Sequence, residues 1–359
     1  MATEPSRNGG GRVDLRDLDR AGLEAFAAGL PGGSAARGRA VFQAIWQAGA
    51  KSLDEMTGVA GRFRKTLAAS ATLGALEVAS SEHSTDGTVK LLWRLADGNV
   101  IESVIIPETN RLTLCISSQV GCAMGCTFCV TGDLGLIRNL TPGEIAAQVL
   151  QAQRDHTGGR RITNVVLMGM GEPLHNLERV STALRILLDD FGLCLSHRKI
   201  TVSTSGLVPK LEKLAADLPV NLAISLHATH EDQRREIMPI SKKWSIVQLI
   251  EACKTLPLPS GKRIAFEYLL IADFNDTEED ADRLVVLLEG VAAKVNLIPY
   301  NENPDRNFRR PDDAAVKRFQ DRLVRQGLAT SIRATRGRDI SAACGQLGVS
   351  QRESTCASA

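Results

Sequence analysis

The sequence predicts an α/β protein: an open, partial (β/α)6 barrel preceded by a small helical domain and a short β extension. Beyond Arg111, short apolar β-branched segments alternate with amphipathic helices, which is typical of a parallel sheet. A helical pattern covers the first part of the chain, and an alternating hairpin pattern lies between the two regions. Six βα units are too few to close an eight-stranded barrel, so we expect an open one with its site at the carboxyl ends of the strands.

The N-terminal region is expected to hold an unstructured tail (residues 1–12) and a helical domain (13–80). Apolar residues recur at helical spacing over residues 23–30 and 40–46, and Pro31-Gly32-Gly33 separates these two segments. Alternating residues at 90–95 and 100–106 predict a hairpin that turns at Asp97-Gly98. We assign this hairpin to a linker spanning residues 81–110.

The main domain is predicted over residues 111–345, followed by a C-terminal tail at 346–359. Thr141-Pro142-Gly143-Glu144 combines an N-cap, a proline at the first helical position and a capping-box glutamate. Asn176 is expected to cap the next helix, and a later helix runs over residues 276–290. The strands are expected at residues 112–117, 164–168, 199–204, 220–226, 264–271 and 294–299.

The composition is that of a folded protein with little overall charge. Of the 359 residues, 43% are hydrophobic and 23% are charged, which allows a large core and excludes wholesale disorder. The 43 Lys and Arg residues against 41 Asp and Glu leave a formal net charge of +2. This excludes a bulk polycation, so a surface for nucleic acid must be a local patch.

The sequence also predicts where the protein works. The amino terminus lacks the apolar core of a signal peptide, and no window has the uncharged apolar length of a membrane span. We therefore expect a cytoplasmic protein without membrane contact. In a reducing compartment, clustered cysteines indicate metal or redox chemistry more often than structural disulfides.

Three cysteines are clustered on the loop after the first predicted strand of the main domain. Cys122, Cys126 and Cys129 form a CxxxCxxC motif. Three thiolates leave one iron of a 4Fe-4S cluster without a protein ligand, and that iron can chelate an amino-carboxylate such as the methionine part of S-adenosylmethionine (SAM). Two alternatives remain open: a zinc site completed by a distant Cys or His, and three unligated cysteines in a tight loop.

This motif, with an aromatic residue before its last cysteine, resembles that of the radical SAM superfamily. A wider set of segments, in order along about residues 13–348, resembles the RlmN family of adenine-C2 RNA methyltransferases. These segments are CISSQVGC (115–122), RNL (138–140), MGMGEP (168–173), VSTSG (202–206), SLH (225–227), PYN (299–301) and TRGRDISAACGQL (335–347). Val130 and Asp133 differ from the small and often basic residues expected at these positions.

The resemblance implies a radical methyltransferase that acts on C2 of an adenosine in 23S rRNA and of one in tRNAs. Adenine C2 lies between two ring nitrogens and is too electron-poor to attack a SAM methyl group directly, which explains the need for a radical route. The implied cofactors are a 4Fe-4S cluster and two SAM molecules per turnover. A flavodoxin or ferredoxin is the expected electron donor, and we expect a monomer.

The resemblance also assigns catalytic roles to three residues. Cys344 matches the cysteine that carries the methyl group, and Cys115 matches the thiol that releases the product by forming a disulfide with it. Glu102 matches the proton acceptor for adenine C2. Taken alone, each has a simpler interpretation: a small buried side chain at Cys344, a strand-core cysteine at Cys115 and a solvent-facing charge at Glu102.

The SAM contacts implied by the resemblance follow the later strands of the barrel. Taken one by one, they are more often turn residues or satisfied polar groups, but together they would surround one opening. Two glycines near the second strand would let the backbone approach a ligand. The implied contacts are Gly171, Glu172, Ser203, Ser225, Leu226, His227 and Asn301.

Two regions are candidates for binding RNA. Residues 301–340 contain ten Lys or Arg against six acidic residues, and Arg62, Arg64 and Lys65 lie close together in the helical domain. Two other functions stay open: a Cfr-like methyltransferase that acts on adenosine C8 of 23S rRNA, and a non-catalytic, metal-bound RNA-binding module.

Overall fold

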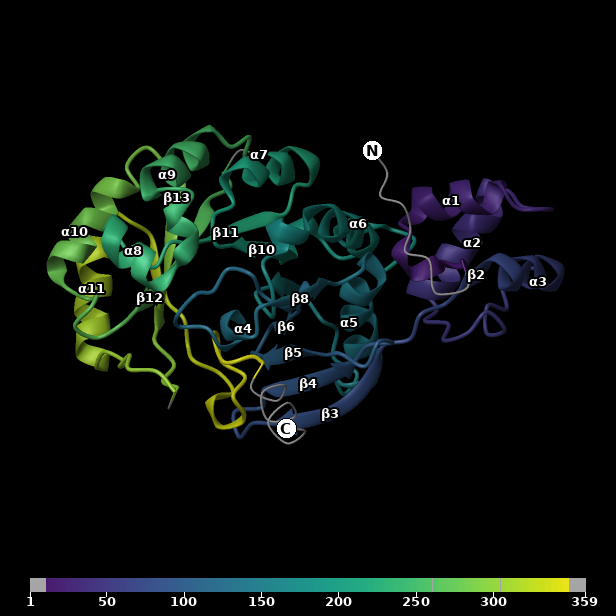
Figure 1. Cartoon of the computed structure of the whole chain (residues 1–359), viewed down its shortest axis with the longest axis horizontal. Coiled ribbons are helices and arrows are strands. Elements are labelled where there is room, and N and C mark those ends of the chain that lie inside the picture. Colours follow the sequence, from purple (N-terminus) through teal and green to yellow (C-terminus); the bar gives the residue numbers. More distant parts are fainter. Residues whose placement is uncertain (1–10, 260, 304, 349–359) are drawn as a thin grey trace.

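A ten-stranded sheet runs through the middle of the molecule (Figure 1). The computed structural model describes residues 11–348 apart from 260 and 304, so the two expected tails lie almost wholly outside the described residues. Across the sheet the strands are β14 (Thr330–Ile332), β13 (Ala293–Pro299), β12 (Ile264–Leu270), β11 (Asn221–Ser225), β10 (Ile200–Thr204), β9 (Asn164–Leu167), β6 (Leu112–Cys115), β5 (Val100–Pro107), β4 (Val89–Arg94) and β3 (Glu77–His83).

The open barrel of six parallel strands is confirmed. Strands β6, β9, β10, β11, β12 and β13 are neighbours in chain order, and each pairs in parallel with the next. Their bounds agree with the predicted ones to within two residues. Strand β14 adds a further parallel partner to β13 that was not predicted. It is only three residues long and mostly exposed, so it carries no apolar signal.

The predicted hairpin is present as β4 and β5, but it continues the main sheet. Strand β5 pairs antiparallel with β6, so the hairpin joins the edge of the barrel directly. Strand β3, which was not predicted, pairs with β4 on the outside. Almost all of its residues are exposed, so no alternation of polar and apolar residues marked it in the sequence.

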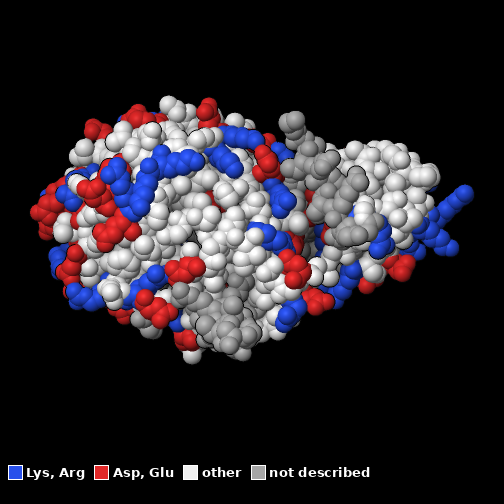
Figure 2. Space-filling view, viewed as in Figure 1, with Lys and Arg blue, Asp and Glu red and all other residues white. Residues whose placement is uncertain are grey.

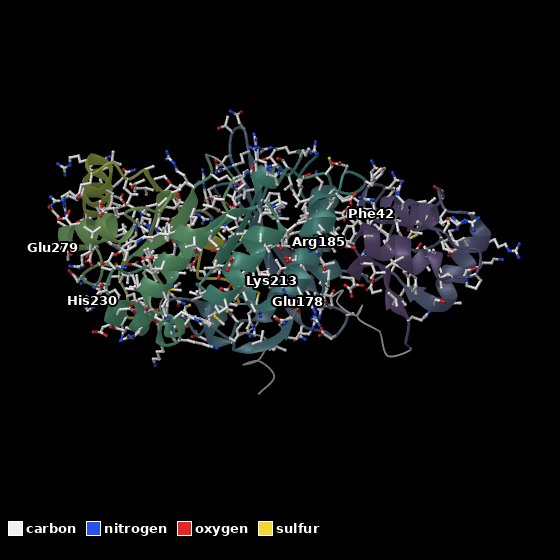
Figure 3. All side chains as sticks on the ribbon, turned by 90° about the horizontal axis from the view of Figure 1, so that it is seen from above. Phe42, Glu178, Arg185, Lys213, His230 and Glu279 are labelled. Atoms are coloured by element: carbon white, nitrogen blue, oxygen red, sulfur yellow. The ribbon has the colours of Figure 1, made fainter. Side chains whose placement is uncertain are left out.

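Helices cover the parallel strands on the outer side of the barrel (Figure 1). On the surface, two ion pairs join α6 (Leu177–Leu188) to α7 (Val208–Asp217). They are Glu178–Lys213 at 3.6 Å and Arg185–Asp217 at 2.6 Å, and three of these side chains are labelled in Figure 3. Such exposed pairs add at most about 1 kcal/mol each, so apolar burial holds the helices. The helices are α5 (Pro142–Asp155), α6 (Leu177–Leu188), α7 (Val208–Asp217), α8 (Glu231–Ile237), α9 (Ile246–Thr255), α10 (Glu278–Leu287) and α11 (Asp313–Arg325).

The two predicted helix starts differ in outcome. The capping box at α5 is confirmed, because the Thr141 hydroxyl accepts from Glu144 N–H and the Glu144 carboxylate accepts from Thr141 N–H. Asn176 does occupy the N-cap position of α6, but the expected side-chain cap is wrong. Its amide instead donates to the carbonyl oxygens of Ser118 and Leu140, which ties the start of α6 to the loop after β6.

The N-terminal helices pack against the barrel and share its core. They are α1 (Arg20–Ala28), α2 (Ala35–Trp46) and α3 (Gly61–Ser70), at the right of Figure 1. Phe42, labelled in Figure 3, is fully buried within a hydrophobic cluster that continues into the barrel. The Asp17 carboxylate accepts from Gly143 N–H at 2.9 Å, so a residue before α1 helps to cap α5.

A buried polar network fastens β5 to the loop that follows β6. The side-chain oxygen of Gln148 accepts from Ser103 Oγ at 2.7 Å and from Ser117 N–H at 2.9 Å, while its nitrogen donates to the Ser117 carbonyl at 2.9 Å. Ser117 Oγ in turn donates to the Glu102 carbonyl at 2.6 Å. The network therefore sets the position of Glu102 relative to the start of the cysteine loop.

We predict that Gln148→Leu lowers the free energy of unfolding by about 2–3 kcal/mol, because it strands several buried partners without hydrogen bonds. Gln151→Leu on the same helix is the matched control. The Gln151 side-chain nitrogen donates to the Leu76 carbonyl at 2.7 Å, and its oxygen accepts an exposed bond from Arg154 at 3.4 Å, so its loss should cost only about 1 kcal/mol. Urea unfolding measures both variants, and equal losses would contradict the structural role given to Gln148.

Candidate active site

A pocket opens at the carboxyl ends of the parallel strands, where the barrel fold places such sites. Its wall takes residues from the ends of β9 to β13, from the cysteine loop, and from the segment around Cys344. Parallel strands with aligned register end at the same edge of the sheet, which brings these distant segments together. The predicted site residues on this wall are Cys122, Cys126, Cys129, Gly171, Glu172, Ser203, Ser225, His227 and Cys344.

The cysteine loop lies over the open end of the barrel between β7 (Gln119–Gly121) and α4 (Val130–Asp133). The Cys129 N–H donates to the Cys126 carbonyl at 3.0 Å, and Thr127 N–H donates to the Ile237 carbonyl at 3.0 Å. The first bond tightens the loop, and the second fastens it to the end of α8. All three thiols therefore face one pocket.

The next question is which metal group these three thiols could hold. Within the described residues, no group of three or more His, Cys, Asp and Glu side chains is arranged to hold a metal ion. A zinc ion needs its thiolates about 2.3 Å away, whereas a 4Fe-4S cluster spreads them over separate iron atoms. The three loop cysteines nevertheless line one pocket, and thiolates are the ligands of iron–sulfur clusters.

Burial gives the three thiols unusual acidities in the metal-free chain. Removal from water raises the pKa of Cys122 to about 12, and the pKa of Cys126 is also raised by burial and by the neighbouring Cys129 and Cys122. Burial likewise raises the pKa of Cys129. A bound cation favours the thiolate form, so this site is chemically prepared to release protons when it takes up metal.

Gly171 allows the chain after β9 to pass very close to β7. Its φ of +102° is in a region that favours glycine, and a Cβ added there would lie 2.5 Å from the Gln119 Cβ and 2.8 Å from its backbone nitrogen. The Gln119 side-chain oxygen also accepts from Glu172 N–H at 2.8 Å. A glycine is therefore needed at position 171 for steric reasons, whether or not it also contacts a ligand.

Glu172 is buried at the pocket wall with its carboxylate held by two backbone groups. One oxygen accepts from Leu174 N–H at 2.9 Å and the other from Ser205 N–H at 2.7 Å. Burial raises the pKa of Glu172, while these hydrogen bonds lower it. The carboxylate keeps lone pairs for a cationic group such as an ammonium.

His227 and its neighbours form the part of the wall after β11. His227 has a φ of +60°, its Nδ1 accepts from Leu269 N–H at 3.1 Å, and its ring meets the Phe128 ring edge-on at 5.0 Å between centroids. Burial lowers the pKa of His227 to about 3, so the ring is neutral. The buried Arg234 donates to the carbonyls of Ser205, Ser225 and Leu226, which holds these strand ends in place.

The segment around Cys344 is tied to the cysteine loop and to β5. Asn301 Nδ2 donates to the Cys344 carbonyl at 3.2 Å, and Val130 N–H donates to the Gly345 carbonyl at 2.8 Å. Three residues further along, Gly348 N–H donates to the Glu102 carboxylate at 3.0 Å. These bonds place Cys344 beside the pocket, far in sequence from the three loop cysteines.

Four predicted site residues lie behind the wall. Cys115, at the end of β6, is buried, and burial raises its pKa to about 12; the nearby Cys344 raises it further, whereas Arg333 lowers it. Glu102 is buried on β5, so the simpler interpretation of an exposed strand charge is wrong. Leu226 is fully buried and offers its backbone, and the Asn301 side-chain oxygen is buried without a hydrogen-bond partner in the described chain.

Two charged residues on the wall were not singled out from the sequence. Glu267 is buried in the middle of β12, and Arg333 follows β14. A glutamate inside the otherwise apolar segment IAFEYLL was a usable signal, because a buried acid needs a partner. Arg333 had no such signal, since it stands among other basic residues.

Five of the ten basic residues in the stretch at 301–340 form ion pairs within the described part of the chain. Its cations alternate with carboxylates, and Figure 2 shows basic and acidic side chains interspersed around the edge of the visible face. The excess of basic residues in this stretch therefore does not produce a uniformly basic surface. The residues that pair with carboxylates are Arg306, Arg309, Arg310, Lys317 and Arg322.

Comparisons with known proteins agree with this geometry. Residues 116–285 match the family model of the radical SAM superfamily. The chain is 49% identical over 340 residues to a dual-specificity RNA methyltransferase RlmN of Anaeromyxobacter dehalogenans (93% of this chain and 91% of the relative), and 50% identical over 342 residues to that of Anaeromyxobacter sp. strain Fw109-5 (94% and 90%). A crystal structure of a radical SAM methyltransferase from Sphaerobacter thermophilus superposes with a TM-score of 0.87 at 43% identity, covering 93% of this chain and 99% of that one.

The fold and the cysteine pocket thus define a radical SAM enzyme, with a 4Fe-4S cluster and SAM as its cofactors. The near full-length similarity is more specific than the superfamily. The chain belongs to the RlmN family of dual-specificity RNA methyltransferases. Within the described residues, no helix has both the length and the apolar character needed to cross a membrane.

We predict that Gly171→Ala destabilises the protein by about 3 kcal/mol or more, because the new methyl group collides with the Gln119 backbone. Gly135→Ala is the control, since Gly135 has a φ of +64° but open space around its Cβ position. That variant should cost about 1 kcal/mol from backbone strain alone. Thermal and urea unfolding compare the two, and an equal cost would show that the close approach at Gly171 is absent.

Proposed function

We propose that this chain methylates C2 of an adenosine in 23S rRNA and of an adenosine in tRNAs, by a methyl-cysteine carrier and a ping-pong use of two SAM molecules. One observation carries the proposal: the three loop cysteines and Cys344 face the same pocket at the carboxyl ends of the barrel strands. A carrier thiol must reach the SAM that reacts at the cluster, and this arrangement meets that requirement.

In this proposal Cys122, Cys126 and Cys129 hold the cluster and leave one iron for SAM. When bound, the cluster supplies the electron that cleaves SAM and yields a 5′-deoxyadenosyl radical, which takes hydrogen from an unactivated methyl group. Gly171, Glu172, Ser203, Ser225, Leu226, His227 and Asn301 hold SAM. The buried Glu172 carboxylate suits the amino group of its methionine part.

Cys344 accepts a methyl group from the first SAM, loses a hydrogen from that methyl group to the radical, and joins adenine C2 through the remaining carbon. Cys115 then attacks the Cys344 sulfur, forms a disulfide and frees the methylated adenosine. The electrostatic effect of Cys344 on the pKa of Cys115 supports this pairing, because it requires the two thiols to be near each other. A dithiol reductant restores both thiols.

Glu102 takes the proton from adenine C2 in the covalent adduct, and the adduct's unpaired electron would return to the bound cluster, which supplied one electron for the cleavage of SAM. Its burial and its hydrogen bond from Gly348 N–H support the assignment, since both link its carboxylate to the segment that carries Cys344. It lies behind the pocket wall, so RNA binding has to draw the Cys344 segment and Glu102 toward the adenine. An adenosine in folded RNA must also be unstacked to enter.

The partners follow from the same chemistry. We propose a flavodoxin or ferredoxin as the one-electron donor, action as a monomer, and a cytoplasmic location, where a reducing environment keeps the reactive thiols free. The seven described cysteines are all free thiols in the structure. Arg62 of α3 and Arg336 near Cys344 form no ion pair within the described residues and are candidates for phosphate contacts.

A Cfr-like enzyme that acts on adenosine C8 shares this cysteine chemistry, and near full-length similarity to RlmN proteins favours C2. Mass spectrometry of the methylated adenosine distinguishes the two positions by fragmentation. A non-catalytic, metal-bound RNA-binding module has no need of a carrier thiol at the pocket. It would show zinc without iron and no cleavage of SAM under reducing conditions.

We predict that Cys126→Ala abolishes binding of the cluster, because two thiolates cannot secure it. After anaerobic reconstitution the unmodified protein should hold about four iron atoms, and the variant well under half of that. Cys194→Ala removes an exposed thiol remote from the pocket and should keep its iron. Iron and sulfide analysis decides the matter, and a variant with full iron content would exclude Cys126 as a ligand.

We predict that neither Cys344→Ala nor Cys115→Ala forms methylated product, for different reasons. Without Cys344 there is no carrier, so no bond to RNA forms. Without Cys115 the bond forms but is not resolved, so RNA stays attached to the protein. Denaturing gel electrophoresis with labelled RNA detects the adduct, and an adduct in Cys344→Ala, or its absence in Cys115→Ala, would refute these roles.

A further inference from the structure

The segment that carries Cys344 is fastened, shortly before that thiol, to the turn between β3 and β4. Gly337 N–H donates to one carboxylate oxygen of Asp86 at 3.0 Å, and the other oxygen accepts from Thr88 N–H at 2.9 Å. In Figure 1 the segment, drawn in yellow, runs beside this turn. The Asp86 carboxylate therefore closes its own turn and binds a segment distant in sequence at the same time.

A second carboxylate makes the reverse connection. Asp339, on the Cys344 segment, accepts from Ser84 Oγ at 2.6 Å and from Thr85 N–H at 3.0 Å, both in the β3–β4 turn. The bond from Ser84 lowers the pKa of Asp339, so its carboxyl group is ionised at neutral pH. Hydrogen bonds to an ionised carboxylate are stronger than bonds between neutral groups. The turn and the segment thus each supply one carboxylate to the other.

The segment and the turn also fit closely around Gly337. This glycine has a φ of +63°, and a Cβ added there would lie 2.8 Å from the Ala342 Cβ and 3.0 Å from the Thr88 Cγ2. Its carbonyl accepts from Ala342 N–H at 2.9 Å. Ser341 has a φ of +50°, which a residue with a side chain keeps only where its surroundings hold it. The contact with the turn is therefore shaped as well as bonded.

Beyond the thiol, the chain is held by other parts of the site. Asn301 Nδ2 donates to the Cys344 carbonyl at 3.2 Å, and Val130 N–H donates to the Gly345 carbonyl at 2.8 Å. Cys344 thus lies on a short span between two fixed points. No described residue of β3, β4 or their turn lines the pocket, so this hairpin influences the site through the segment that it holds.

We propose that Asp86 and Asp339 are positioning residues, and that the β3–β4 turn is an anchor that sets the reach of Cys344 into the pocket. This inference rests on the proposed function, in which Cys344 meets SAM, the radical and adenine in turn. A displacement of about 1 Å in a reacting group can lower a rate about a hundredfold, so the thiol needs a fixed point from which its span extends.

The first measurement is hydrogen–deuterium exchange in the full-length protein without SAM or RNA. We expect Asp86→Ala and Asp339→Ala to raise the exchange rates of amides in residues 337–348 about tenfold or more, because the anchored segment opens more often. Amides of β12, at the centre of the barrel, should exchange at the unmodified rate.

Asp97→Ala is the matched control, because Asp97 closes the β4–β5 turn in the same way. Its carboxylate accepts from Asn99 N–H at 3.1 Å, and the glycine that follows has a φ of +85°, against +83° at Gly87 of the β3–β4 turn. Its other side-chain bonds are to Asn99 Nδ2 and Arg138, away from the Cys344 segment. Exchange in residues 337–348 should stay unchanged in this variant.

The second measurement is single-turnover methylation of Cys344 by SAM in the cluster-loaded protein without RNA. The Cys344 sulfur bonds to the methyl carbon while the carbon–sulfonium bond breaks, the thiol proton passes to water, and S-adenosylhomocysteine leaves. Mass spectrometry of the tryptic peptide 339–352, which holds no other cysteine, follows the product. We expect both anchor variants to lower the maximal rate about tenfold or more and to leave the SAM concentration at half-maximal rate within about twofold.

Unchanged exchange in residues 337–348 of both variants would overturn the anchor. Faster exchange with a normal maximal rate, or an equal loss of rate in Asp97→Ala, would overturn its positioning role. Should Asp339→Ala fail to fold, Ser84→Ala removes the hydroxyl donor of the same contact and should give smaller changes in the same direction. An unmodified protein that leaves Cys344 unmethylated would overturn the proposed function and the positioning role together, whereas the exchange result would still decide whether the anchor exists.

Discussion

The structure depends on the contact between the end of the chain and the loop that carries three cysteines. Two hydrogen bonds join these segments: Val130 N–H donates to the Gly345 carbonyl at 2.8 Å, and the Thr131 hydroxyl donates to the Leu347 carbonyl at 2.7 Å. Neither segment has enough regular structure to hold its shape alone. Their contact completes one pocket at the edge of the barrel and brings Cys344 into its wall together with the three loop cysteines.

Burial determines the acidity of the thiols in this pocket. The thiols that have to become anionic lie where water is scarce, and burial alone favours their neutral forms. In the proposed function, a bound cluster would favour the thiolate forms of the three loop cysteines.

Much of the fold was predictable because its elements have local signals. Six buried parallel strands appear as apolar segments, and the capping box before α5 satisfies the first turn within four residues. The failures share a cause. Strands β3 and β14 are mostly exposed, and Asn176 bonds the loop after β6 rather than its own helix, so each is stabilised by partners distant in sequence.

The sequence by itself determined the class of the protein, because three cysteines at this spacing and a series of short motifs in a given order carry specific chemistry. It also determined the six βα units, because their pattern of buried and exposed residues can be recognised from residues adjacent in the sequence. Only the tertiary structure decided which thiols and charges are neighbours. Glu267 and Arg333 meet at the pocket through parallel register and the end of β14, and the burial that alters the acidity of Cys115 comes from surrounding segments that no local pattern encodes.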